Sequence, residues 1–501
     1  MFKLTKISDA QFASSVLATA GLLAGLVANA AAAPNDAPAQ SCRVPGLRHA
    51  ALCGVVKRPL DPTRPNGVQI DIHYAVVPAL ARRKLPDPVF LLAGGPGQSA
   101  IALGPRLMPL FSRLNNRRDV VLVDQRGTGL SAPLMCVDTR SRPLAELTDM
   151  TAQLGEINGC KEKLQALPYG DLRFFSTVLA MQDLDAVRRH LGAQRINLVG
   201  ASYGTRAALE YQRQFPSAVR RSVLDGVAPA DMALPVSMSV DNQAAWDALL
   251  RDCEQTEPCR SAHPRLRSEA AVLLGSLPRA VTVAHPLTGQ REIFTYTREA
   301  LLAALRGPLY APYLSAALPQ AISDAAAGRF EGLLGLSSWL SSRKDGALAM
   351  GMHFSVICAE DAPRMAAATA VNSADFGDSS AQLYAKVCAS WPQGAVPPAF
   401  YDIPSSSSPV LLLSGGLDPA TPPRHAQRVA QALGAKALNV VVPNAGHGVM
   451  NVGCMRDVIH KFIDAEEDDA ALKVATDCAA AVPRPGAFEP LRLPLLPPAA
   501  K

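Results

Sequence analysis

The chain has 501 residues, a net charge of +6, and a composition that is 49% hydrophobic and 18% charged. This composition is typical of a globular protein, and the length favours one large domain that carries a substantial insertion. The net charge is small for this length, and no dense Lys/Arg run is interleaved with aromatic residues, which argues against a nucleic-acid partner.

The first thirty residues have the pattern of a cleaved secretory signal. Lys3 and Lys6 give a basic start, an apolar stretch covers Val16–Val27, and small residues follow up to Ala30. The apolar stretch is short for a membrane span, although a membrane anchor is the alternative. We therefore expect cleavage after Ala30 or Ala33, export to the periplasm or the medium, and no stable membrane insertion of the mature chain.

Short apolar runs that end in glycine or polar turns recur along the next part of the chain. Val68–Val77 alternates like a half-buried strand. Continuous runs occur in "PVFLLAGGPG" (Pro88–Gly97), "DVVLVDQRGTGLS" (Asp119–Ser131), "INLVGASYG" (Ile196–Gly204) and "VRRSVLDGVAP" (Val219–Pro229). With helical stretches between them, such as Ala180–Gly192, these runs predict buried parallel strands in βαβ units.

Ser202 lies between Gly200 and Gly204, where an apolar strand gives way to an alanine-rich, helix-prone stretch. A serine hydroxyl is a poor nucleophile and needs an adjacent base, an anion pocket and open access. A sharp strand-to-helix turn lifts the serine above the sheet and aims helix N–H groups at the reacting oxygen. We predict that Ser202 is a catalytic nucleophile; the alternative is a small residue in a structural turn.

The pattern changes from about Ala230 to Tyr401, where most of the chain is alanine- and leucine-rich helix with one expected strand pair. Strand-like runs return at Pro409–Pro423 and Ala437–Gly448. A helical insertion of domain size thus interrupts the predicted parallel sheet. The expected division is signal peptide 1–30, first core part 31–229, helical cap 230–401, second core part 402–482 and Pro-rich tail 483–501.

The partners of a serine in such a turn follow in the order acid, then histidine. His447 lies in the glycine-flanked loop "NAGHG" and is our predicted general base. His425 is too close to the candidate acid, and His460 lies within an amphipathic helix. Asp418 ends the preceding strand and is predicted to orient the imidazole, the alternative being a turn aspartate before proline.

The second part of an anion pocket should come from the glycine-rich loop after an earlier strand, Ala93–Ser99. Glycines there let the backbone approach a substrate closely. We predict that the N–H groups of Gly95 and Tyr203 form an oxyanion hole, with Gly94 as the alternative to Gly95.

Ten cysteines follow the predicted signal, and an even number in an exported chain indicates disulfides. Buried free thiols are the alternative. Pairing neighbours gives the shortest loops, so our hypothesis is Cys42–Cys53, Cys136–Cys160, Cys253–Cys259, Cys358–Cys388 and Cys454–Cys478. No cysteine pair or Cys/His cluster has the spacing of a zinc site, and we expect neither a metal nor another cofactor.

The motifs "GGPG", "DQRGTGLS", "GASYGTRAALEY" and "LDPATPP…GHG" together resemble the proline iminopeptidase and tripeptidyl aminopeptidase branch of the α/β-hydrolases. The resemblance covers roughly Gly54 to Asp464, and Cys358–Arg364 is more similar to the tripeptidyl aminopeptidase type. It implies an α/β-hydrolase fold: a mostly parallel central sheet flanked by helices, with a mainly helical cap. It also implies a serine exopeptidase that removes residues from free peptide N-termini.

Such an enzyme must hold the ammonium group of its substrate, which calls for carboxylates near the cleft. Glu360 and Asp361 are the candidates, and a structural ion pair is the alternative. Arg126, in "DQRG", is expected to brace loops by hydrogen bonds rather than to take part in chemistry. Ala93 stands where the iminopeptidases usually carry histidine, so the resemblance leaves selectivity for proline open.

The sequence therefore predicts an exported serine aminopeptidase, active as a monomer on short peptides. An esterase or amide hydrolase with the same three residues is the nearest alternative, because ester and amide acyl transfer use the same groups. A non-catalytic binding protein on this fold is the alternative from another functional class.

Overall fold

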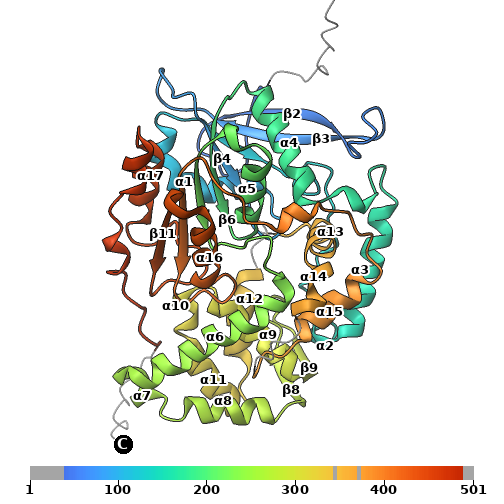
Figure 1. Ribbon diagram of the computed structural model, residues 1–501. Coiled ribbons are helices and arrows are strands. Elements are labelled where there is room, and N and C mark those ends of the chain that lie inside the picture. The colour runs from blue at the N-terminus through green and yellow to red at the C-terminus, as the bar shows by residue number, and fades with distance from the viewer. Residues whose placement is uncertain (1–38, 342–346, 369–373, 489–501) are drawn as a thin grey trace, which may run out of the picture. The chain divides into compact units, whose positions relative to one another are not determined.

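Nine strands form one sheet within the residues that the computed structural model describes, 39–341, 347–368 and 374–488 (Figure 1). In sheet order they are β1 (Gln40–Cys42), β2 (Ala51–Pro59), β3 (Gln69–Val77), β5 (Val120–Val123), β4 (Val89–Leu92), β6 (Ile196–Ala201), β7 (Val219–Asp225), β10 (Val410–Gly415) and β11 (Ala437–Val442). The predicted signal peptide, 1–30, lies outside the described residues. None of the helices in the described ranges is both long and apolar enough to cross a membrane.

The sheet is parallel from β5 to β11 and antiparallel at its other edge. β4 pairs in parallel with β5 and β6, and parallel pairing continues through β7 and β10 to β11. β1, β2 and β3 pair antiparallel with one another, and β3 pairs antiparallel with β5. The prediction of a mostly parallel sheet is confirmed, while β1 and β2 were not predicted from the sequence.

Helices cover both faces of the sheet because successive strand side chains point to opposite sides. Phe90 and Leu92 of β4 face one apolar cluster, and Val89 and Leu91 face the other. The first cluster is shared with α4 (Thr177–His190), α5 (Tyr203–Gln214) and α16 (Pro423–Leu433). The second is shared with α1 (Ala100–Asn115), α17 (Met455–Asp464) and α18 (Asp468–Leu472).

Two segments are inserted between these elements. The shorter, between β5 and α4, holds α2 (Leu144–Thr148) and α3 (Met150–Gln165). The longer, between β7 and β10, holds α6 (Leu234–Gln255), α7 (Glu257–Ala262), α8 (Leu266–Gly275), β8 (Arg279–Ala284), β9 (Arg291–Tyr296), α9 (Arg298–Leu309), α10 (Pro312–Ser315), α11 (Leu318–Ala326), α12 (Glu331–Ser341), α13 (Met350–Glu360), α14 (Ala362–Ala368) and α15 (Ser379–Cys388).

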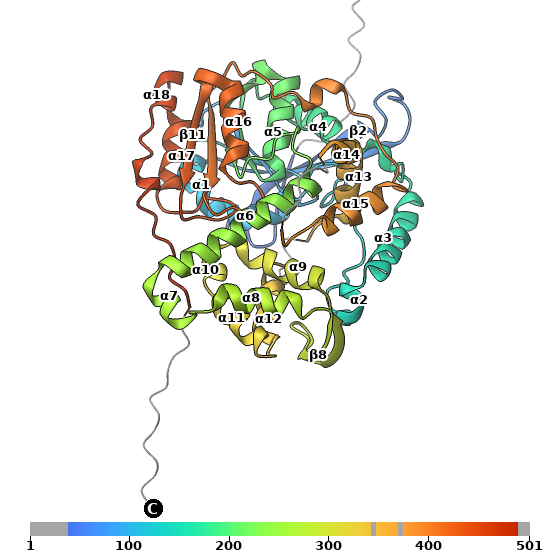
Figure 2. The same cartoon turned by 60° about the horizontal axis from the view of Figure 1, so that its bottom comes forward.

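The longer insertion packs in two parts. Figure 2 shows α6, α8, α9, α11 and α12 gathered together near β8, and they share a separate apolar core that includes Trp246, Leu301 and Phe330. In contrast, Phe354 of α13 and Trp391 after α15 belong to the apolar cluster on the α4–α5 face of the sheet. The α13–α15 part thus packs with the sheet rather than with the separate core.

Five disulfides join the described cysteines, and each joins the pair of sequence neighbours that the hypothesis named. They are Cys42–Cys53, Cys136–Cys160, Cys253–Cys259, Cys358–Cys388 and Cys454–Cys478. The paired residues are 6 to 30 positions apart. Each such loop stabilises the fold by about 2–4 kcal/mol, chiefly by restricting the unfolded chain.

Candidate active site

The chain turns sharply at Ser202. β6 ends at Ala201 and α5 begins at Tyr203, so Ser202 is the single connecting residue. Its φ of +55° lies in the left-handed region, which is strained for a residue other than glycine. The turn needs small neighbours, because a Cβ on Gly200 would lie 2.3 Å from the carbonyl oxygen of Gly204. The structure thus has the tight strand-to-helix turn that the motif predicts.

Asp418 and His447 are hydrogen-bonded, although 29 positions separate them in the sequence. Asp418 follows β10, His447 follows β11, and Nδ1 of His447 donates to Oδ2 of Asp418 at 2.8 Å. The Thr421 hydroxyl donates to the same oxygen at 2.8 Å and lies 3.1 Å from Nδ1 of His447. Sequence reasoning missed Thr421; the available signal was a hydroxyl three positions after an aspartate in a turn.

Burial and charge act on this pair in opposite directions. Burial lowers the pKa of His447, but the charge of Asp418 and the hydrogen bond to it outweigh burial and raise that pKa above its ordinary value of 6.5. Burial likewise raises the pKa of Asp418, yet the charge of His447 and the hydrogen bonds lower it overall. The pair is therefore an ionised carboxylate beside a readily protonated imidazole, as a general base requires.

Asp225 and Gly226, at the end of β7, connect Ser202 to His447. The N–H of Ser202 donates to the Asp225 carbonyl at 2.8 Å. A Cβ on Gly226 would lie 3.1 Å from Cε1 of His447, so the imidazole lies directly against this glycine. The Asp225 carboxylate accepts from the N–H of Val449 at 2.8 and 2.9 Å and so holds the loop that carries His447. Burial raises the pKa of Asp225 to about 6.

The longer insertion also contacts the imidazole. Tyr310, directly after α9, accepts a hydrogen bond at its carbonyl from the N–H of His447 at 2.8 Å. The two rings meet edge to face, with their centroids 5.1 Å apart. A residue of the predicted cap therefore fixes both the backbone and the ring of His447.

The loop after β4 lies against Ser202 on the other side. A Cβ on Gly94 would lie 3.2 Å from the Cβ of Ser202. The first N–H groups of α5, which begins at Tyr203, have no partner within the helix. The N–H groups that the sequence analysis assigned to anion binding, those of Gly95 and Tyr203, thus belong to the two segments that flank Ser202.

α13 braces this loop through two contacts. The N–H of Ala349 donates to the carbonyl of Gly97 at 2.9 Å, and Nδ1 of His353 lies 3.2 Å from the carbonyl oxygen of Pro96. Nε2 of His353 is hydrogen-bonded to the Tyr384 hydroxyl at 2.7 Å. The loop is therefore tied to α13 and, through His353, to α15.

Glu360 and Asp361 lie in a buried ion cluster, with exposed fractions of 0% and 1%. Arg206 donates to Asp361 at 2.9 and 3.0 Å and lies 3.5 Å from Glu360. The N–H and the hydroxyl of Thr177 donate to Glu360 at 2.7 and 2.9 Å, and burial raises the pKa of Glu360 to about 7. These contacts are those of a structural ion pair, the alternative left open above, and the amine-binding role stays a prediction.

Two family models match the chain. The model described as "alpha/beta hydrolase fold" matches residues 87–267, and the one described as "TAP-like protein" matches residues 372–474. The chain is an α/β-hydrolase. The first match includes the turn at Ser202, and the second includes Asp418 and His447, so both halves of the site lie within matched segments.

This hydrolase is similar to two peptidases and an esterase. It is 30% identical over 238 residues to serine protease Hip1 of Mycobacterium tuberculosis, a match that covers 43% of this chain and only 44% of Hip1. It is 25% identical over 465 residues to tripeptidyl aminopeptidase of Streptomyces lividans, which covers 86% of this chain and 84% of the relative. It is 27% identical over 469 residues to carboxylesterase B of M. tuberculosis, with 85% and 86% covered.

Arg126 braces loops in this hydrolase, as its position in "DQRG" predicts. Its guanidinium donates to the Asp183 carboxylate at 2.7 and 2.9 Å and to the carbonyls of Leu60 and Phe174 at 3.0 and 2.7 Å. It thereby joins the ends of β2 and of the segment before α4. Because the guanidinium nitrogens donate to these three residues, Arg126 has a structural role.

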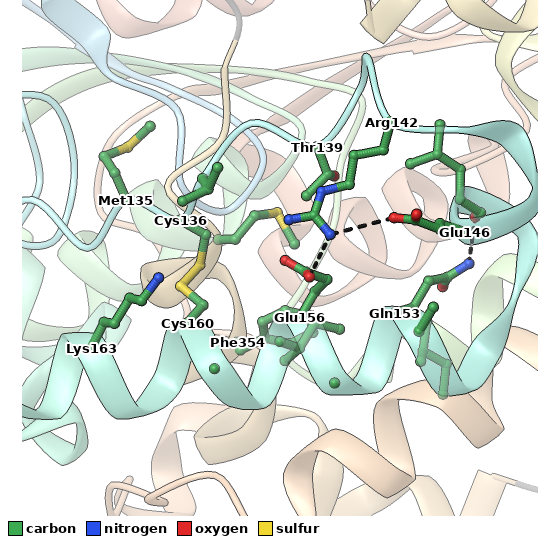
Figure 3. A pocket seen from close by; sticks show the side chains of 18 of the residues that line it. Met135, Cys136, Thr139, Arg142, Glu146, Gln153, Glu156, Cys160, Lys163 and Phe354 are labelled. Atoms are coloured by element: carbon green, nitrogen blue, oxygen red, sulfur yellow. Dashed lines mark hydrogen bonds and ion pairs between the residues drawn. A yellow bond between two sulfur atoms is a disulfide. The ribbon is translucent and has the colours of Figure 1, made fainter.

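A cavity of about 640 Å³ lies between α3, α13 and α15. Figure 3 shows Arg142 at its wall between Glu146 and Glu156, with the Cys136–Cys160 disulfide nearby. Its apolar lining includes Met135, Val137, Leu147, Ile157, Met350 and Phe354. Tyr384 lines it too, and through His353 this tyrosine is connected to the loop beside Ser202.

Proposed function

We propose that this hydrolase is an exported serine aminopeptidase that cleaves peptide bonds near the free N-termini of short peptides, of the proline iminopeptidase or tripeptidyl aminopeptidase type. The observation that carries the proposal is the 2.8 Å hydrogen bond between Asp418 and His447. The imidazole of this pair lies against Gly226, and Asp225, the preceding residue, accepts a hydrogen bond from the N–H of Ser202. The similarity to a tripeptidyl aminopeptidase over 84% of that protein supports the choice of substrate.

In the proposed mechanism Ser202 attacks the scissile carbonyl and His447 takes its proton. Asp418 keeps the imidazole in the tautomer with Nδ1 protonated and stabilises the charged form. The N–H groups of Gly95 and Tyr203 donate to the developing oxyanion. His447 then gives its proton to the leaving amine, and water hydrolyses the acyl-enzyme by the same groups in reverse.

Recognition of the substrate ammonium group is proposed for Glu360 in preference to Asp361. Asp361 neutralises Arg206 through two hydrogen bonds of 2.9 and 3.0 Å. The Glu360 carboxylate is farther from the guanidinium, at 3.5 Å. Glu360 also lies next to Thr177, whose hydroxyl is 2.7 Å from that of Tyr203. Glu360→Gln should raise KM for free-amine peptides and leave KM for N-acetylated ones unchanged; an equal change in both would contradict the assignment.

The cavity beside α3 is the proposed site for substrate side chains. Its volume and the apolar part of its lining suit apolar side chains, and Tyr384 connects it through His353 to the loop proposed to bind the oxyanion. The cap, 230–401, is proposed to restrict the cleft to short peptides and chain ends, since Tyr310 of this segment contacts His447.

Export is part of the proposal as well. The first thirty residues have the layout of a secretory signal, and the five disulfides are of the kind that persists in oxidising compartments. Fractionation of cells that express the full chain should place the processed protein outside the cytoplasm; retention of the unprocessed chain in the cytoplasm would contradict export.

A panel of anilides tests the activity. We expect kcat/KM for a tripeptide anilide with a free amine to exceed that for its N-acetyl form by about 10-fold or more, because a charge-assisted contact is lost on acetylation. Ala- and Pro-anilides measure how many residues are released, and Ser202→Ala controls for contaminating peptidases. If free amines give no advantage, the aminopeptidase assignment fails.

The similarity to carboxylesterase B over 86% of that protein favours an esterase as the second candidate. The same panel separates the two, since simple p-nitrophenyl esters need no ammonium recognition. Rapid hydrolysis of esters together with no hydrolysis of any peptide anilide would support the esterase.

A further inference from the structure

Arg306, on α9, is a cation near the candidate site that has no partner among the residues that the structure describes. Its side chain is half-buried, yet among the described residues it has neither an ion pair nor a hydrogen bond. Fully buried arginines are almost always paired, because an uncompensated charge is costly to desolvate, and a half-buried guanidinium bears part of that cost. A half-buried guanidinium without a counter-ion therefore suggests that an anion from outside the chain binds there.

The position of Arg306 follows from the helix. Arg306 and Tyr310 are four positions apart at the end of α9, so their side chains lie on the same side. The ring of Tyr310 contacts that of His447 with centroids 5.1 Å apart. Burial raises the pKa of Tyr310 and of Tyr384, and the charge of Arg306 partly offsets both shifts, which is consistent with a guanidinium near the two hydroxyls.

The carboxylates around these tyrosines are already engaged. Asp418 binds His447 and Thr421, and Asp361 binds Arg206. Asp241 accepts from Arg424 and lies 3.1 Å from Nε2 of His425. The charge of Arg306 is thus not neutralised by these acids. The Tyr310 hydroxyl likewise has no hydrogen bond within the described part of the chain, so two donors are free on this side of His447.

The chemistry of the proposed reaction determines which part of a substrate lies beside His447 and Arg306. His447 gives its proton to the leaving amine, so the leaving segment must lie beside the imidazole. Arg306 is four residues before Tyr310, about 6 Å along a helix axis. An extended residue spans about 3.3–3.6 Å, so the carboxylate of a leaving amino acid or dipeptide can reach the guanidinium.

We propose that Arg306, together with the hydroxyl of Tyr310, binds the C-terminal carboxylate of the leaving segment. A guanidinium binds a carboxylate through two parallel hydrogen bonds, which gives both affinity and orientation. The preferred substrates are then short peptides with a free C-terminus, in which one or two residues follow the scissile bond. This inference rests on the proposed aminopeptidase function and adds the recognition of the second end of the peptide.

The test compares Ala-Ala-Ala-Ala as the free acid with its C-terminal amide, with products quantified by mass spectrometry. The readout is the ratio of the two kcat/KM values, which is independent of the fraction of active enzyme. We expect the wild type to prefer the acid by about 10-fold or more and Arg306→Met to reduce the ratio to about 1. Arg306→Lys should give an intermediate ratio, because lysine keeps the positive charge but cannot form the two parallel hydrogen bonds of a guanidinium.

Arg251→Met is the matched control, since it removes an exposed arginine from α6 and should keep the wild-type ratio. A wild-type ratio near 1, or an Arg306→Met variant that keeps the preference, would overturn the inference. Cleavage of tripeptide anilides with no preference for the acid would overturn the inference alone. Absence of cleavage of every peptide and anilide would overturn the proposed function and the inference with it.

Discussion

The protonation of His447 depends on one neighbour, Asp418. A general base must be neutral, and Asp418 raises the pKa of His447 above 6.5, so kcat/KM should fall as the pH drops through that raised value. Asp418→Asn removes the charge, and burial then lowers the pKa. The acid limb of the pH–rate profile should move to lower pH while kcat drops by up to about 10⁴-fold. An unchanged acid limb in the variant would contradict this account of Asp418.

Thr421 is a positioning residue, because its hydroxyl donates to Asp418 at 2.8 Å and acts on the imidazole through that carboxylate. Thr421→Val keeps the shape and deletes the donor, which should lower kcat about 10-fold with little change in KM, since a hydrogen bond to a buried carboxylate is lost. Thr421→Ser restores the donor and should recover most of kcat. A serine variant as impaired as the valine variant would show that packing, not the hydroxyl, is what matters.

Single residues differ in how well the sequence predicts their contacts. The structure places Ser202, Asp418 and His447 at turns that follow strands, where the motifs predicted them, because those motifs encode local turns. Arg206 was not predicted to bind Asp361, since 155 positions separate them and each lies within an ordinary helical stretch. Asp225 was missed for a similar reason: its partner Val449 is 224 positions away.

At the scale of elements, α3 offers a test of the cavity. Gly159 is interior to this helix and lines the cavity, and a Cβ there would meet nothing within 4 Å. Gly159→Ala should therefore raise the free energy of unfolding by up to about 1 kcal/mol, because alanine is the better helix former. Denaturant unfolding of the two proteins measures this, and a destabilised alanine variant would contradict the open space beside the helix.

Gly159→Phe places a large side chain at a position that lines the cavity, whereas Gly159→Ala adds only a methyl group. If substrate side chains enter the cavity, the phenylalanine variant should raise KM for tripeptide anilides with large apolar residues more than for Ala-Ala-Ala-anilide. The alanine variant should keep both KM values. Equal KM values for all three proteins would remove the cavity from the proposed substrate path.

Strands were predicted where they carry a continuous apolar run. β4, β5 and β10 are buried along their whole lengths and were recognised, as was the β8–β9 pair in the insertion. β2 was missed because only Ala51 and Val56 of its nine residues are buried, and Gly54, Lys57 and Arg58 interrupt the apolar pattern. A strand of this kind depends on pairing with its neighbours β1 and β3 rather than on its own pattern.

At the scale of the whole molecule, the buried cluster around Arg206 joins α5 to α13. Arg206→Met leaves two buried carboxylates without their cation, which should cost about 3–5 kcal/mol of unfolding free energy. Burial already raises the pKa of Glu360, and loss of the Arg206 charge would raise it further, so the stability that this group contributes is lost as the pH increases. The loss should therefore be larger at pH 8 than at pH 5, when each variant is compared with wild type at the same pH.

Arg267→Met is the control for that comparison. Its partner Glu254 and Arg267 itself are both about half exposed, at 48% and 49%, so the variant removes a surface ion pair. Such pairs contribute about 0–1 kcal/mol. Equal losses in the two variants, or a loss in Arg206→Met that does not depend on pH, would contradict the structural role of the cluster.

The division of the molecule was harder to foresee than its strands. The sequence pattern marks the whole of 230–401 as one helical insertion, yet Phe354 and Trp391 pack with the sheet while Trp246 and Phe330 have a core of their own. Both parts consist of apolar helices, so composition and periodicity do not separate them. Which helices share a core is decided by long-range packing, which one sequence does not display.

The central claim is that Ser202 is a nucleophile activated by His447, and a fluorophosphonate probe tests it most directly. Intact-mass measurement should show one covalent adduct on the wild type, and peptide mapping should locate it at Ser202. Ser202→Ala should show no adduct, and His447→Ala should react far more slowly. An unlabelled wild-type protein that is correctly folded, or an adduct on another residue, would contradict the account.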